Sequence, residues 1–299
     1  MSDYLWDKSG PPDPEIERLE KLLAPLGMKP KSRTIMHKRV WIPVAIAACL
    51  LLGWIVSHRT VSPWQVRTLA GNPAAESGRT IHTDSKSRAR LELTDVGQVE
   101  LEPDTNLRVL SAQNLDLTRG TIHAEIWAPP GQFSVNTPSA RTVDLGCAYT
   151  LKVDDHGIGL VEVTAGWVAF ESNGRESFIP AAAACETKPG RGPGVPYYQD
   201  ATAALQEAVH QYDSGAQTVP IILREARQRD AITLWHLLRR VPTAERGEVY
   251  DRMAALIQIP SSITRDGVVA GNATMLDNLW NSLDLGDTSW WRMWKSRTP

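Results

Sequence analysis

The residue types that most often carry chemistry, histidine and cysteine above all, are present in this 299-residue chain but do not gather into a metal site. A zinc site requires clustered histidine or cysteine ligands. The seven histidines are scattered, with no two at ligand spacing: His37, His58, His82, His123, His156, His210 and His236. We therefore expect neither a bound metal nor another cofactor.

The acidic residues do not indicate catalysis either. Asp104, Asp154 and Asp155 resemble paired acids, but each falls in a turn, where aspartate is common because its side chain bonds the local backbone. The sequence contains no G-x-S-x-G nucleophile elbow and no Walker loop. We expect a protein that is not an enzyme and has no catalytic residues. The formal net charge of −2 gives no reason to expect nucleic-acid binding.

Two of the three cysteines, Cys147 and Cys185, lie far from the amino terminus. In an oxidising compartment they could pair, but a disulfide needs Cα atoms within about 7 Å, which sequence spacing does not reveal. Two alternatives stay open, namely a Cys147–Cys185 disulfide and two separate buried thiols.

An uncharged run over residues 40–57, VWIPVAIAACLLLGWIVS, predicts a transmembrane helix. Its length is roughly 27 Å, close to the hydrocarbon thickness of a bilayer, and it lacks the polar stripe of a soluble helix. Basic residues gather before it: Lys29, Lys31, Arg33, Lys38 and Arg39. The positive-inside rule then keeps residues 1–39 in the cytoplasm and exports the rest. In a bacterium this is a single-pass inner-membrane protein with a periplasmic body.

The elements after this run fall into a β part and a helical part. Ala89, Leu91 and Leu93 begin an alternation of apolar and polar residues that continues, between turns, to about residue 187. This pattern predicts an all-β domain over 63–187, a sandwich, roll or solenoid. Residues 188–198 are rich in glycine and proline and predict a linker. Helical periodicity then predicts a small all-α domain over 199–299 that ends in a tryptophan-rich tail.

The predicted cytoplasmic head, residues 1–39, carries a short amphipathic helix. Asp13-Pro14-Glu15 has the residue types that begin a helix. A head of this size cannot bury its apolar side chains against itself, so we predict a partner-binding surface. The alternative is a helix that lies on the membrane surface, which the acidic residues of the head disfavour. The predicted partner-binding residues are Tyr4, Leu5, Trp6, Ile16, Leu19, Leu22 and Leu23.

The β segment resembles the FecR domain of bacterial envelope signalling proteins over roughly residues 78–175. The resemblance is carried by an ordered set of short motifs: Gly97-x-Val99-x-Leu101-x-Pro103-x-Thr105-x-Leu107, Leu115-x-Leu117-x-Arg119-Gly120, Phe133-x-Val135-x-Thr137-Pro138, Gly146-Cys147-Ala148-Tyr149-x-Leu151-x-Val153 and Val163-x-x-Gly166-x-Val168. It implies a FecR-like roll or solenoid, and a regulator that holds an extracytoplasmic-function sigma factor on its cytoplasmic side. The exported domain would receive a signal from a periplasmic or outer-membrane protein.

These observations together predict a multi-domain membrane protein with one transmembrane helix, a FecR-like all-β domain and a small all-α domain. The leading hypothesis for its function is a sigma-factor regulator, or anti-sigma factor, in signal transduction across the inner membrane. The alternative is a non-catalytic envelope scaffold that binds glycan or protein. For that reading, Arg141, Asp144 and Trp167 are candidates for a sugar-binding face.

Overall fold

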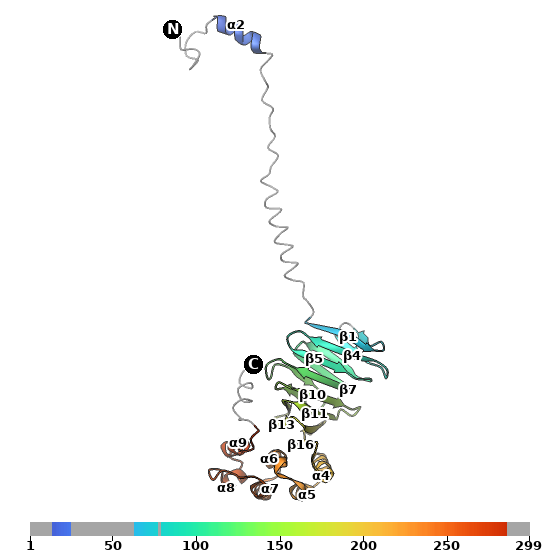
Figure 1. Ribbon diagram of the computed structural model, residues 1–299, viewed down its shortest axis with the longest axis vertical. Helices are drawn as coiled ribbons and strands as arrows, with labels where there is room; N and C mark the ends of the chain where they lie inside the picture. The colour runs from blue at the N-terminus through green and yellow to red at the C-terminus, as the bar shows by residue number, and fades with distance from the viewer. Residues whose placement is uncertain (1–13, 25–62, 77–78, 286–299) are drawn as a thin grey trace. The chain divides into compact units, whose positions relative to one another are not determined.

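The computed structural model describes residues 14–24, 63–76 and 79–285 (Figure 1). The chain divides into two compact units, residues 1–60 and residues 61–299, and each is considered separately. In the first unit, α2 (Pro14–Leu23) begins at the predicted Pro14. Among the described residues, no helix is both long and apolar enough to cross a bilayer. The predicted span, residues 40–57, lies outside them.

The strands of the second unit form one continuous curled sheet, like a half barrel. Its two parts, called sheet A and sheet B, share the long strand β7 (Asn114–Ile126). Sheet A consists of β1 (Trp64–Ala70), β4 (Arg88–Leu93), β5 (Gly97–Leu101), the second half of β7, β10 (Ala148–Val153), β11 (Gly159–Ala165) and β14 (Ala183–Lys188). Sheet B consists of β2 (Ala74–Glu76), β3 (Thr80–His82), β6 (Asn106–Ser111), the first half of β7, β8 (Ser134–Asn136), β9 (Arg141–Asp144), β12 (Trp167–Ser172) and β13 (Arg175–Pro180).

The predicted alternation is confirmed where the strands pack. In β4 the burial pattern places Ala89, Leu91 and Leu93 inside, while Arg90 and Glu92 are half-buried on the other face. In β10, Tyr149, Leu151 and Val153 are buried in the same alternating way. A strand places successive side chains on opposite faces, so these apolar sets meet in one core inside the curled sheet.

A glycine allows β7 to pass from one sheet to the other. Gly120 has a φ of +101°, a conformation that side chains of L-residues disfavour. The hydroxyl of Thr105 lies at the same corner, where it accepts the backbone N–H of Thr121 at 3.0 Å and donates to the Thr121 carbonyl at 3.1 Å. Thr105 therefore bonds both backbone groups of Thr121 at the bend, where the Thr121 carbonyl also accepts the Glu102 N–H at 3.0 Å.

Residues 188–198, predicted as a linker, are built into the sheet. β15 (Gly192–Pro193) and β16 (Tyr197–Tyr198) both pair with β14. Gly190 and Gly192 have positive φ values of 75° and 71°, so they close a tight turn between β14 and β15. Glycine and proline here serve a turn and an edge, where a strand tolerates them, and Val195 is fully buried.

Helices follow the sheet in the second unit, as the period of the sequence predicts (Figure 1). They are α4 (Ala203–Ser214), α5 (Val219–Glu225), the 3₁₀ turn η2 (Gln228–Asp230), α6 (Ala231–Leu238), α7 (Thr243–Leu256), α8 (Arg265–Val269) and α9 (Ala273–Asn281). Thr202 caps the start of α4 and Gly215 ends it with a φ of 103°. All eight residues of α6 are buried, so this helix forms the centre of the helical layer.

Candidate partner-binding site

The leucines of α2 form an exposed apolar stripe. Leu19, Leu22 and Leu23 expose 56%, 70% and 56% of their surface, and residues three and four apart share one face of a helix. The Nζ of Lys21 lies 3.2 Å from a carboxylate oxygen of Glu17, an exposed ion pair within the helix. Of the other predicted head residues, Ile16 belongs to α2, but its side chain is not described. Tyr4, Leu5 and Trp6 lie outside the described residues.

This stripe has the properties of a partner-binding surface. A ten-residue helix is marginal in water by itself, and most helical stability comes from the packing of an apolar face. The acidic first turn, with Glu15 and Glu17, favours the helix through its dipole. Among the described residues of the first unit, however, no segment covers the leucines. A complementary apolar groove on a partner would supply this packing.

In the second unit, α6 covers the outer edge of β13. The His236 Nε2 lies 3.4 Å from the Phe178 backbone nitrogen and 3.3 Å from its carbonyl oxygen. Burial, together with Arg240 and Arg239, holds the pKa of His236 well below its usual range. The neutral ring bonds to the Phe178 backbone through Nε2, which accepts the N–H in one tautomer and donates to the carbonyl oxygen in the other. Arg240 donates to the Ser177 hydroxyl at 2.6 Å, which extends the cover along the strand.

An aromatic cluster joins β12 and β13 to α9. The Trp280 ring on α9 lies 4.7 Å from Trp235, 5.7 Å from Phe178 and 5.8 Å from Trp167, measured between ring centroids. Trp280 is fully buried. Large aromatic surfaces dominate the energetics of such junctions. The helices therefore share one hydrophobic core with the sheet.

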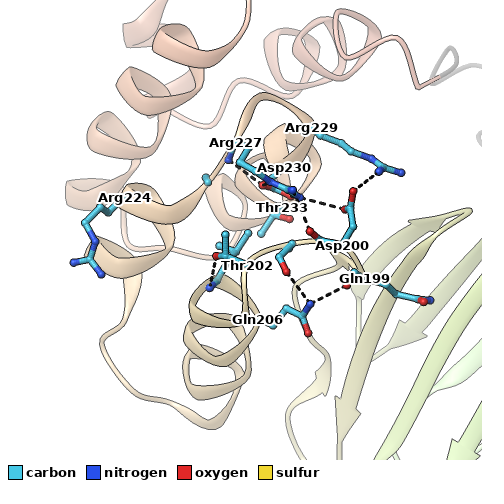
Figure 2. A network of polar contacts seen from close by, with 12 residues as sticks. Gln199, Asp200, Thr202, Gln206, Arg224, Arg227, Arg229, Asp230 and Thr233 are labelled. Atoms are coloured by element: carbon cyan, nitrogen blue, oxygen red, sulfur yellow. Dashed lines mark hydrogen bonds and ion pairs between the residues drawn. The ribbon is translucent and has the colours of Figure 1, made fainter.

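Figure 2 shows a polar network at the start of the helical layer. The buried carboxylate of Asp230 accepts the Arg227 backbone N–H at 2.9 Å and its Nε–H at 2.8 Å. Arg227 and Arg229 both donate to Asp200, at 3.2 Å and 2.6 Å. The Arg229 guanidinium also lies 4.2 Å from the centre of the Tyr198 ring in β16. The network fixes the turn after β16 against the segment between α5 and α6.

Both cysteines of the second unit are free and buried, so the structure has the arrangement of two separate thiols. The Cys147 thiol donates to a carboxylate oxygen of Asp144, whose other oxygen accepts the Gly146 N–H at 2.7 Å. Burial raises the pKa of Asp144 to about 6, against the lowering effect of these hydrogen bonds. Burial also raises the pKa of the Cys147 thiol, and the Cys185 thiol lies 3.3 Å from the Gly194 carbonyl oxygen.

The three candidates for a sugar-binding face do not form one. Asp144 is buried against Cys147, and the Trp167 ring packs on Trp280. Arg141 is exposed and donates to the Ser134 hydroxyl at 3.3 Å. Within the part of the chain that the structure describes, no three histidine, cysteine, aspartate or glutamate side chains are placed to bind a metal ion.

Sequence reasoning missed His236, Arg240 and Asp230, which hold the helices to the sheet. His236 and Arg240 bond to residues far away in the chain, with Phe178 and His236 58 positions apart. Asp230 bonds to Arg227, whose side chain also reaches Asp200, 27 positions earlier. A lone buried histidine or arginine leaves no spacing pattern, so no signal in the sequence identifies these contacts.

The chain is similar to known proteins over part of its length. Two crystal structures of a candidate anti-sigma factor from Parabacteroides distasonis ATCC 8503 are similar at 18% sequence identity, with a TM-score of 0.35. The match covers 44% of this chain and 64% of that protein's chain. No curated protein matches. Residues 79–169, about a third of the chain, match the family model described as FecR protein.

Proposed function

We propose that this chain is a single-pass regulator of the bacterial inner membrane that holds a sigma factor on α2 and receives an envelope signal through its FecR domain. The FecR match over residues 79–169 is the observation that carries the proposal. The exposed leucines of α2 support it, since they provide an apolar surface in the segment that the charge pattern assigns to the cytoplasm.

The chemistry of α2 fits a sigma factor. DNA-binding proteins carry basic surfaces that attract phosphate groups, and the first turn of α2 carries Glu15 and Glu17. Acidic residues around an apolar stripe would steer the helix to such a surface, while the leucines would supply the buried contact. An α2 bound in this way would compete with promoter DNA.

Co-purification with the full-length chain tests the proposal. The chain is expressed in its host, extracted in mild detergent, and the retained proteins are identified by mass spectrometry. A sigma factor retained by the native chain and lost in the Leu19→Asp, Leu22→Asp variant is the expected result. The control is Lys21→Gln, which removes the ion pair but keeps the leucines and both glutamates. A sigma factor that is absent from the native sample, or equally retained by both variants, contradicts the proposal.

A further inference from the structure

A cleft with a volume of about 520 Å³ lies where the sheet meets the helices. One part of its wall comes from Arg175, the first residue of β13, and Arg191, in the turn between β14 and β15. Another part comes from Glu245 and Glu248 on α7. Clefts of this size bury small ligands in other proteins. No described segment of the chain fills this one.

The two arginines are neighbours, because the Arg175 side chain bonds to the Arg191 backbone. The Arg175 Nη1 donates to the Arg191 carbonyl oxygen at 3.2 Å. The Arg191 guanidinium lies over Gly215, the C-cap of α4. A Cβ at position 215 would be 2.7 Å from the Arg191 Nη2. Gly215 therefore leaves the space in which Arg191 sits, and the guanidinium is positioned at the cleft. An arginine fork is well suited to a carboxylate.

The acidic side of the cleft is equally available. Glu245 and Glu248 are three residues apart in α7 and therefore share one face. Neither they nor Arg191 forms an ion pair within 4 Å among the residues that the structure describes. Tyr212 lines the same cleft. Burial raises the pKa of its hydroxyl, with smaller and opposing effects of Arg240 and Asp213 and then of Arg175 and Glu245. The remaining lining includes the apolar Val219, Pro220 and Pro242.

We infer that this cleft binds a short peptide that carries both a carboxylate and an ammonium group. Arg191, supported by Arg175, would bind the carboxylate, and the glutamates of α7 would bind the ammonium group. The apolar lining and the Tyr212 ring would contact the aliphatic part between the two charges. The inference goes beyond the proposed function, because it concerns the second unit alone and needs no sigma factor.

Isothermal titration calorimetry on the full-length chain in detergent tests this inference with defined peptides. The probes are tri-alanine, its N-acetylated form, its C-terminal amide and the doubly blocked peptide. N-acetyl-Glu-Ala-Lys-amide is a fifth probe, which distinguishes side-chain charges from chain ends. Removal of one charged end of tri-alanine should weaken binding about tenfold or more, since hydrogen bonds to charged groups are among the strong ones. The doubly blocked form should not bind.

Variants assign each charge to its wall. Arg191→Gln should remove the preference for a free carboxylate, and Glu245→Gln with Glu248→Gln should remove the preference for a free amine. Arg224→Gln is the matched control, because Arg224 is exposed and pairs with Glu225 outside the cleft. Thermal unfolding of each variant checks that the fold is intact. No heat of binding with tri-alanine or with N-acetyl-Glu-Ala-Lys-amide would overturn the inference, as would equal binding of all five probes. Unchanged selectivity in the Arg191 and glutamate variants would overturn it too.

Discussion

The imidazole of His236 in α6 lies against the backbone of Phe178 in β13, with its Nε2 3.4 Å from the Phe178 nitrogen. A strand at the end of a sheet normally presents unpaired backbone groups that another chain can join. Here a helix side chain occupies that edge, and four of the six residues of β13 are buried. By contrast β1, at one end of sheet A, is exposed along nearly its whole length. The helical layer therefore covers the end of sheet B that β13 forms.

The first prediction concerns the aromatic junction. Replacement of a buried tryptophan by alanine costs about 3 to 5 kcal/mol, so Trp280→Ala should lower the free energy of unfolding of the second unit by that amount. Trp127→Ala is the control, since Trp127 exposes 63% of its surface and should cost less than about 1 kcal/mol. Urea unfolding followed by circular dichroism measures both. If the β signal of Trp280→Ala unfolds at the native midpoint, the sheet does not depend on its helices.

The second prediction concerns the corner of β7. A Cβ at position 120 would lie 2.4 Å from both the Cα and the Oγ1 of Thr105, so Gly120→Ala should destabilise the domain by more than about 2 kcal/mol. Gly174→Ala is the matched control. Gly174 also has a positive φ, of 75°, but has open space around it, and only the backbone cost of about 1 kcal/mol applies. Equal unfolding midpoints for the two variants would argue against the corner contact.

The network in Figure 2 provides a third prediction, because its two aspartates differ in burial. Asp230 is fully buried, and its loss leaves the Arg227 backbone and side-chain donors without their acceptor. We expect Asp230→Ala to cost about 3 kcal/mol. Asp200 is 53% exposed, and Asp200→Ala should cost less than about 1 kcal/mol. Thermal unfolding at low and at high salt separates the two, since only the exposed pairs should weaken with salt.

A fourth prediction follows from Asp144. Because burial raises its pKa from 3.8 to about 6, the folded state binds a proton more tightly than the unfolded state does. The stability that this group contributes is present below about pH 4 and is lost as the pH rises to about 6, by about 2 to 3 kcal/mol. Asp144→Asn removes this loss while it keeps an acceptor for the Gly146 N–H. The stability of Asp144→Asn relative to the native chain should therefore rise between pH 4.5 and pH 7. A difference that is constant with pH would show that Asp144 is ionised throughout.

Local patterns in the sequence predicted the elements well, because each rests on neighbouring residues. The alternation of Leu91 and Leu93 with charged residues predicted β4. Asn173-Gly174 is typical of a type I′ turn, since both residue types tolerate positive φ, and their φ values are 49° and 75°. Pro14 and the acids after it predicted the start of α2. These signals need no knowledge of distant contacts.

Features that depend on distant partners were beyond the sequence. The composition of residues 188–198 indicated a free linker, but β14 pairs with both of its halves and buries Val195. The spacing of Cys147 and Cys185 left a disulfide open, and only the fold assigned Asp144 and Gly194 as their separate partners. The cleft brings Arg191 together with Glu248, 57 positions later in the chain, and neither residue type is unusual on a protein surface.

The most direct test of the proposed function is the set of transcripts that changes when α2 alone is altered on the chromosome. RNA sequencing would compare the native strain with Leu19→Asp, Leu22→Asp and with the Lys21→Gln control, at equal levels of the protein. A sigma-factor regulator predicts a coherent change in the promoters of one sigma factor, confined to the leucine variant. Identical transcripts in all three strains would contradict a role for this chain in sigma-factor regulation through α2.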